Sequence, residues 1–285
     1  MPDPLSVSEW DVPWLGLVVG NTRLHWGLFR QQQLQAVWHT PHLTSAQVTE
    51  LLDHQFGVAA WRSLPTLDRS TLDELTKLAA ILPPASPLRL VVASVVPAQT
   101  DLWQRYPYFR EVTLADIPLA NLYPTLGIDR ALNLLGAGDR YGWPVLVIDA
   151  GTALTFTAST AERLIGGAIL PGLTTQFTTL AANTANLPTA HLPTELPSRW
   201  ASHTAEAIRS GVIYGTLATL TDYVQAWRQD YPAGQIVLTG GDGPKLYQWW
   251  QSQNPKTPGM TLEPHLTFLG LSHLQPALLA TGPQF

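Results

Sequence analysis

Cysteine is absent from this chain of 285 residues. Its absence excludes disulfide bonds, thiolate catalysis and cysteine-based zinc sites, and it fits a reducing compartment. Only 13% of the residues are charged, the formal net charge is -5, and no useful cluster of lysine and arginine occurs. Binding of nucleic acid requires a basic surface that displaces counterions. We therefore expect no nucleic-acid partner.

Long apolar runs are missing as well. The first residues, MPDPLSVSEWDVPW, lack the basic stretch and apolar core of a signal peptide. No uninterrupted apolar stretch approaches the about 20 residues that a membrane span requires. We expect a cytoplasmic protein with no membrane partner. A hydrophobic content of 45%, with 24 prolines and 11 tryptophans, predicts a folded chain with a full core and many rigid turns.

Strand and helix patterns alternate along the chain and predict an α/β fold. The expected strands cover residues 15–19, 23–29, 34–39, 88–97, 145–159 with a turn inside, 164–170 and 235–238. The expected helices cover residues 44–54, 70–81, 99–106, 129–141, 204–229 and 241–251. The first three strands are joined by very short turns, which predicts a meander.

The sequence repeats one pattern in its two halves. When LGLVVGNTRLHWGLF is laid over VLVIDAGTALTFTAS with Gly20 on Gly151, an apolar strand, a glycine, a small hydroxyl residue and a second strand coincide. The repetition predicts a duplicated domain, although two unrelated apolar hairpins would look similar. Under this overlay Asp149 falls opposite Val18, so the first copy lacks the acid of the second.

Each of these strand–glycine–threonine turns is a candidate phosphate-binding site. Such turns expose backbone N–H groups and a hydroxyl at one point, and glycine permits close approach of an anion. Two turns of this kind would hold a polyphosphate, and Asp149 would hold a neutralising cation. TGGDG (239–243) follows a short strand and opens a helix, so it is either a third nucleotide contact or an ordinary glycine-rich turn.

The segment YPTLGIDRALN contains the candidate for acid–base chemistry. Asp129 can accept the proton of an attacking hydroxyl, and Arg130 can hold an anionic substrate. An acid in the first turn of a helix is also an ordinary partner of the helix dipole. The P-loop, dinucleotide and hydrolase motifs are absent. The eight histidines have no metal-binding spacing, so most are expected at the surface or in packing.

Together these motifs resemble those of type III pantothenate kinases. The segments, in family order, are GNTRLHWGLF, ASVVP, LGIDRALN, VIDAGTALTF, GGAILPG, HTAEAIRSGVIYG and VLTGGDG, from about Leu15 to about Asp242. The resemblance implies two duplicated ribonuclease-H-like domains, as in actin, hexokinase and acetate kinase, with a nucleotide cleft between them. Residues 1–122 would form the first and residues 123–285 the second. It also implies ATP-dependent phosphorylation of pantothenate, the first step of coenzyme A biosynthesis, by a homodimer.

The resemblance further implies a role for each motif. Asp129 would be the general base, and Asp149 would bind the cation, which in this family is Mg²⁺ together with a monovalent ion, K⁺ or NH₄⁺. The implied contacts to the ATP phosphates are Gly20, Asn21, Thr22, Gly151, Thr152, Gly240 and Gly241. The implied pantothenate-site residues are Tyr123, Gly127, Ile128, Arg130, Gly166, Gly172 and Thr204, the last contributed by the partner subunit.

The chain departs from the family pattern at two positions. The usual acid of the first turn is Val18, and the usual asparagine before Thr204 is His203. Because valine cannot hold a cation, two alternatives stay open beside the pantothenate kinase. One is a non-catalytic regulator on the same scaffold, and the other is a kinase for a different small hydroxylated acid. The retained Asp129, Asp149 and both turns favour a working kinase.

Overall fold

The computed structural model describes residues 13–64, 71, 88–255 and 259–280. The chain forms two compact units. The first consists of Met1–Pro118, Pro124–Leu132 and Thr267–Phe285, and the second of Leu119–Tyr123 and Asn133–Leu266. The chain therefore passes between the units four times, and its last segment belongs to the first unit.

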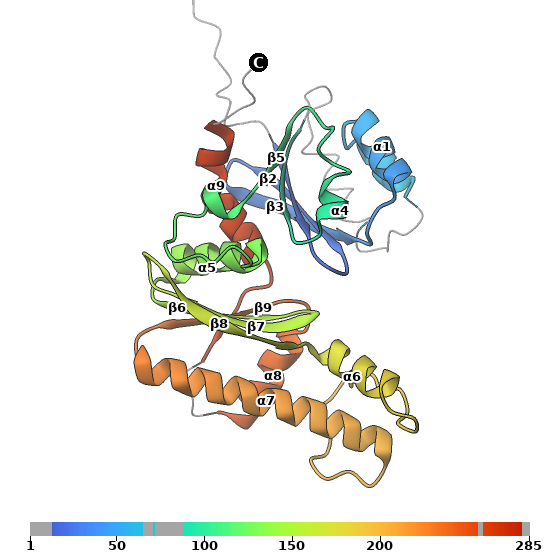
Figure 1. The fold of residues 1–285 in the computed structure, drawn as a ribbon, viewed down its shortest axis with the longest axis vertical. Coiled ribbons are helices and arrows are strands. Elements are labelled where there is room, and N and C mark those ends of the chain that lie inside the picture. The colour runs from blue at the N-terminus through green and yellow to red at the C-terminus, as the bar shows by residue number, and fades with distance from the viewer. Residues whose placement is uncertain (1–12, 65–70, 72–87, 256–258, 281–285) are drawn as a thin grey trace, which may run out of the picture. The chain divides into compact units, whose positions relative to one another are not determined.

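The first unit contains a five-stranded mixed sheet with the order β3-β2-β1-β4-β5 (Figure 1). Its first three strands form the expected antiparallel meander, while β4 runs parallel to β1 and β5 parallel to β4. The strands are β1 (Trp14–Val19), β2 (Leu24–Arg30), β3 (Gln33–Thr40), β4 (Arg89–Ser94) and β5 (Phe109–Glu111).

The second unit repeats this arrangement. Read from the corresponding edge, its sheet has the order β8-β7-β6-β9-β10. The strands are β6 (Val145–Ala150), β7 (Ala153–Ser159), β8 (Leu164–Pro171), β9 (Gln235–Thr239) and β10 (Thr261–Leu262). Again the first three are antiparallel and the last two parallel. The predicted fold class, α/β with two duplicated ribonuclease-H-like domains, is confirmed. The implied nucleotide cleft stays a prediction.

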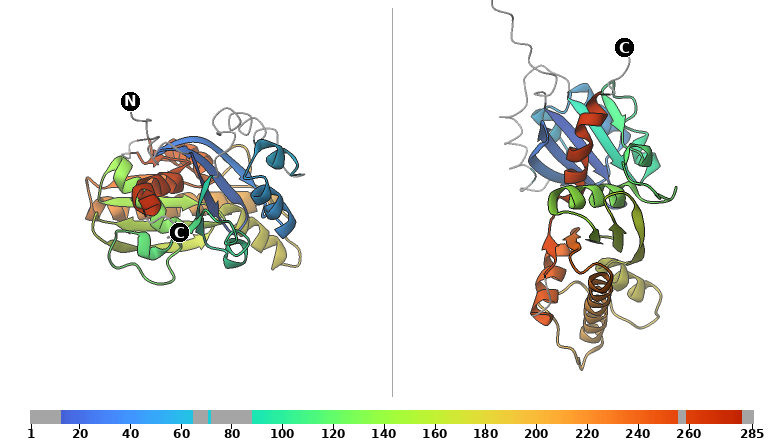
Figure 2. Two further views of the ribbon diagram at one scale, coloured as in Figure 1. Left: turned by 90° about the horizontal axis from the view of Figure 1, so that it is seen from above. Right: turned by 90° about the vertical axis from the view of Figure 1, so that its left-hand side faces the viewer.

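Helices cover both faces of the first sheet. Helix α1 (Ser45–Asp53) begins at a capping box in which the Thr44 hydroxyl accepts the Gln47 amide at 3.3 Å. The opposite face carries α9 (Leu266–Ala280), drawn in red in Figure 2. Phe268 and Leu271 of this helix lie against Gly27 and Gly16. The remaining short helices are α2 (Val58–Arg62), α4 (Pro97–Thr100) and η2 (Leu114–Asp116).

Aromatic side chains fill the first core. Trp26 of β2 contacts Trp61 and Trp103, with ring centroids 4.9 and 5.2 Å apart and the rings nearly perpendicular. This edge-to-face arrangement is the preferred geometry of aromatic pairs. The expected helix over residues 99–106 is wrong beyond Thr100, where α4 ends and turns carry Trp103 into this core. The helix expected over residues 70–81 lies outside the described residues apart from Thr71.

The second core lies between its sheet and helices α7 (Thr204–Asp230) and α8 (Gly243–Gln253), which cover one face (Figure 1). Ile148 of β6 contributes to this core, as do Ile213 of α7 and Trp250 of α8. The other helices are α5 (Ile128–Tyr141) and α6 (Leu173–Ala182). Within the part of the chain that the structure describes, no helix is long and apolar enough to cross a membrane.

Gly138 in α5 allows Trp143 to pack against the helix. A Cβ built on Gly138 would lie 1.9 Å from the Trp143 ring, which no real contact permits. We expect Gly138→Ala to lower the free energy of unfolding by about 1–3 kcal/mol, because the indole must shift. Urea denaturation followed by circular dichroism measures this. Gly211→Ala, in α7 with open space around it, is the control, and equal stability of both variants would contradict the expectation.

Candidate active site

The first predicted phosphate loop, Gly20 to Thr22, connects β1 and β2. The Gly20 amide donates to the Arg23 carbonyl oxygen at 3.0 Å, so this N–H closes the turn. Asn21 and Thr22 are exposed. His42 Nε2 lies 2.8 Å from the Gly20 carbonyl oxygen, and because a carbonyl only accepts, His42 is the donor. His42 follows β3 in the chain, and no local sequence signal predicted this contact.

The second predicted loop, Gly151 and Thr152, connects β6 and β7 in the same way. The Gly151 amide donates to the Ala153 carbonyl oxygen at 3.0 Å. Gly172, which precedes α6, donates its amide to the Thr152 carbonyl oxygen at 3.0 Å. A Cβ on Gly172 would lie only 2.0 Å from the Gly151 carbonyl oxygen. Gly172 therefore belongs to the second loop, and only glycine fits there.

The glycine-rich turn after β9 lies beside the residues that precede the second loop. Strand β9 runs parallel to β6 and pairs Thr239 with Asp149. Gly240 has φ +90°, and a Cβ there would lie 2.5 Å from both Asp149 Oδ1 and the Ala150 carbonyl oxygen. This backbone conformation and this close approach both require glycine. The second unit thus gathers Asp149, Gly240 and the second loop into one cluster.

Asn133 of α5 holds the Asp149 carboxylate. Its Nδ2 donates to Asp149 Oδ2 at 3.0 Å, and the Asn133 side chain is almost fully buried. The other carboxylate oxygen, Oδ1, is the atom beside Gly240. The hydrogen bond fixes the orientation of the carboxylate. Asn133 stands in the LGIDRALN motif, but the contact joins residues far apart in the sequence and was missed.

Asp129 lies in the first turn of α5, and its carboxylate is beside Gly127. The Arg130 amide donates to Asp129 Oδ1 at 2.8 Å, and a Cβ on Gly127 would lie 2.4 Å from the same oxygen. The position favours a negative charge because of the helix dipole. Burial raises the pKa of the Asp129 carboxyl, and the Arg130 amide and guanidinium partly oppose this shift.

Val95, in the ASVVP segment, connects the Asp129 turn with the first loop inside the first unit. The Val95 amide donates to the carbonyl oxygen of Val19, the residue before Gly20, at 3.1 Å. The Val95 side chain lies 3.7 Å from the Cβ position of Gly127. The structure thus gathers two predicted motifs of the first unit around the end of β4.

The remaining predicted site residues have varied surroundings. Arg130 and Ile128 are buried, Tyr123 is 39% exposed, and Thr204 is the exposed first residue of α7. Gly166 of β8 has φ +152°, with open space where a side chain would point. Gly241 likewise has open space beside it. How these residues relate to pantothenate stays a prediction.

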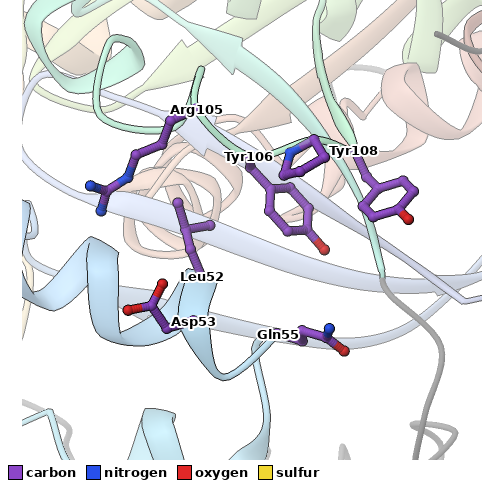
Figure 3. A pocket seen from close by; sticks show the side chains of 7 residues that line it. Leu52, Asp53, Gln55, Arg105, Tyr106 and Tyr108 are labelled. Atoms are coloured by element: carbon purple, nitrogen blue, oxygen red, sulfur yellow. The ribbon is translucent and has the colours of Figure 1, made fainter. Parts of the chain in front are cut away.

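A pocket of about 310 Å³ occupies a separate part of the first unit, between the end of α1 and the segment before β5. Figure 3 shows its lining side chains, which include Asp53, Arg105 and Tyr108. None of the predicted site residues lines this pocket. The pocket is therefore separate from the predicted phosphate-binding and pantothenate-binding motifs.

The described residues contain no group of three or more histidine and acidic side chains placed to hold a metal. The carboxylate of Asp149 lies beside Gly240 and beside Gly151 of the second predicted loop. Mg²⁺ in kinases is commonly held by one or two carboxylates, substrate phosphates and water. The Asp149 carboxylate, oriented by Asn133 beside the predicted second phosphate loop, fits that requirement.

Structural comparison bears on the fold. A conserved protein from Campylobacter jejuni, described as a Baf family transcriptional activator, has a TM-score of 0.58 and 16% sequence identity. The match covers 92% of this chain and 98% of that structure. At this identity the likeness concerns the fold alone.

Sequence comparison identifies the family. The model of the type III pantothenate kinase family matches residues 14–226. A type III pantothenate kinase from Nostoc sp. is 44% identical over 271 residues, covering 93% of this chain and 95% of the relative. One from Synechocystis sp. is 40% identical over 264 residues, covering 91% and 89%. This chain therefore belongs to the type III pantothenate kinase family and is a kinase.

Proposed function

We propose that this enzyme transfers the γ-phosphoryl group of ATP to pantothenate and forms 4'-phosphopantothenate, the first step of coenzyme A biosynthesis. The observation that carries the proposal is the placement of Asp129. Its carboxylate lies in the first turn of α5 beside Gly127, and its pKa is raised. Membership of a family of pantothenate kinases supports the choice of substrate.

Asp129 acts as the general base. It accepts the proton of the pantothenate hydroxyl as the oxygen attacks the γ-phosphorus. A raised pKa makes the carboxylate a better proton acceptor, and the side chain is held by the Arg130 amide. Arg130 also supplies positive charge for the pantothenate carboxylate. Tyr123, Gly127, Ile128, Gly166 and Gly172 complete the pantothenate site in this proposal.

The two loops bind the ATP phosphates. Since the amides of Gly20 and Gly151 already donate within their turns, these glycines serve close approach of the phosphates, not donation. Asn21, Thr22 and Thr152 supply the polar contacts. Gly240 keeps the third turn close to Asp149, and Gly241, which has open space beside it, leaves room for the nucleotide.

Asp149 would hold the Mg²⁺ and the monovalent cation, K⁺ or NH₄⁺. When bound, these cations neutralise the negative charge that builds up on the phosphates during transfer. Asn133 keeps Asp149 oriented for this purpose through its 3.0 Å hydrogen bond. Position 18 carries valine in this chain, so Asp149 is the carboxylate to which we assign the cations.

A homodimer completes the proposal, with Thr204 of each subunit reaching the pantothenate site of the other. Exposed apolar side chains in the second unit support an interface, because Trp200 is 91% exposed and Ile169 63% exposed. Sedimentation equilibrium of the purified protein tests the assembly. The cytoplasm, where ATP is available, is the proposed compartment.

Mass spectrometry of the reaction product tests the proposed activity. Purified protein is incubated with ATP, Mg²⁺ and pantothenate, with and without K⁺. We expect 4'-phosphopantothenate that depends on K⁺. No product from folded protein in either condition would overturn the assignment and favour the non-catalytic alternative. A product only from a different hydroxylated acid would favour the other kinase.

The Mg²⁺ dependence of the rate should change when Val18 is replaced by an acid. We expect Val18→Asp to lower the Mg²⁺ concentration needed for half-maximal rate by roughly 10-fold, because the added carboxylate at the end of β1 would attract the cation. A Mg²⁺ titration of the initial rate measures this. Val18→Asn is the control of equal size without the charge. The same titration for both variants would show that charge at position 18 does not affect the metal.

A further inference from the structure

A row of side chains crosses three strands beside the first phosphate loop. Val18 of β1 lies directly opposite His25 of β2, and His25 lies directly opposite His39 of β3. Directly opposed residues in antiparallel strands have their side chains on the same face of the sheet. The cross-strand neighbour of Val18 is therefore His25, and the cross-strand neighbour of His25 on the next strand is His39.

The His25 ring faces the first loop. A Cβ built on Gly20 would lie 3.8 Å from His25 Nε2 and 4.0 Å from Cδ2, so the Nε2 side of the ring borders the turn. The next loop residues, Asn21 and Thr22, are exposed, whereas His25 itself is partly buried. A ligand that reaches the loop therefore meets Nε2 at its edge.

A hydrogen bond between the His25 and His39 rings couples the tautomers of the two side chains. The two Nδ1 atoms lie 2.9 Å apart, so one ring donates to the other. Burial, together with the neighbouring His39 and Arg23, lowers the pKa of His25 to about 4, so His25 is neutral near pH 7. When His39 donates, His25 carries its single hydrogen on Nε2. The opposite arrangement would turn a lone pair of Nε2 toward the loop and repel an anion.

We propose that His25 donates an Nε2–H hydrogen bond to a nucleotide phosphate held at Gly20 to Thr22, and that His39 fixes the donor tautomer. The proposal rests on the proposed function, because it needs that loop to bind ATP. His42 contributes by holding the Gly20 carbonyl at 2.8 Å and so fixing the loop beside His25. A direct donor to phosphate thus stands next to Val18, which can provide no cation ligand.

Nucleotide affinity tests the role of His25 without turnover. Calorimetry would measure binding of the non-hydrolysable analogue AMPPNP, and of adenosine, to the full-length protein. We expect His25→Leu to weaken AMPPNP binding roughly 10- to 100-fold, the range for a hydrogen bond to a charged group, and to leave adenosine binding unchanged. His25→Gln, which keeps an amide donor near the Nε2 position, should recover most of the affinity.

The control and the outcomes separate this inference from the function on which it rests. His54→Leu, at the exposed end of α1, should bind AMPPNP like the unmodified protein. Equal AMPPNP affinity of His25→Leu and the unmodified protein would overturn the inference and leave the kinase assignment standing. Failure of the unmodified, folded protein to bind AMPPNP would overturn the proposed function and the inference together.

The tautomer provides a second measurement that does not depend on any variant. Proton–nitrogen correlation spectra of the AMPPNP complex, with ¹⁵N-labelled histidine, distinguish protonated from unprotonated ring nitrogens. We expect His25 to show a protonated Nε2 and an unprotonated Nδ1. A His25 ring protonated on Nδ1 alone would overturn the inference, because its Nε2 would then have no hydrogen to donate.

Discussion

Asp129→Asn is expected to lower kcat by about 10²–10⁴-fold and to leave the protein folded, because the amide cannot accept the hydroxyl proton. The asparagine side chain keeps an oxygen that can accept the Arg130 amide, so the start of α5 keeps its hydrogen bond. Single-turnover measurements with saturating ATP and pantothenate would isolate the chemical step. A variant that retains near-full kcat would show that Asp129 is not the base.

The pH dependence of kcat/KM gives an independent check on the same residue. Burial raises the pKa of Asp129, so the carboxyl takes up a proton at a higher pH than an ordinary aspartate. Only the ionised form can act as a base, and the rate should therefore fall as the pH drops through this raised pKa. The fall should be absent from the residual rate of Asp129→Asn. The same acidic limb in both proteins would assign it to another group.

Gly172→Ala should nearly abolish nucleotide binding at the second loop. The added methyl would stand 2.0 Å from the Gly151 carbonyl oxygen and 2.8 Å from that of Thr152. Both atoms are backbone, so the clash cannot be relieved by turning a side chain. The turn must move, and we expect AMPPNP affinity to fall by at least roughly 100-fold, as expected for the loss of several phosphate contacts. Calorimetry on the folded variant measures this.

Gly259→Ala is the matched control for Gly172→Ala, since a methyl there meets open space and no positive φ is required. It should bind AMPPNP with the affinity of the unmodified protein. Thermal melting of both variants separates local distortion of the loop from general unfolding. If folded Gly172→Ala binds AMPPNP normally, the second loop does not bind the phosphates.

The sequence predicted the sheets better than their surroundings. The apolar runs at β1, β4 and β6 are buried strands, and the overlay of Gly20 on Gly151 anticipated two sheets of identical order. A duplicated pattern of this kind persists because each copy must form the same hairpin and turn. Short strands such as β5 and β10 have too few residues to establish an alternation, and they were missed.

The supporting contacts of the candidate site could not be predicted. The fold brings distant segments together in two of these contacts. One joins Asn133 to Asp149, and the other joins His42 to Gly20. The histidines were expected mostly in packing or at the surface, yet His25 and His42 both border the first loop. Residue type and spacing give no signal of such neighbours, whereas the glycines of the turns were visible because their conformations exclude most other residues.

The return of the chain to its first unit has a consequence for biosynthesis. Helix α9 covers the face of the first sheet formed by Gly16 and Gly27, but the whole second unit is encoded before it. The ribosome therefore exposes that sheet early, while Phe268 and Leu271 emerge only after residue 266. During this interval the glycine-lined face of β1 and β2 stays uncovered in the nascent chain. Completion of the first unit therefore has to wait until the second unit has been synthesised.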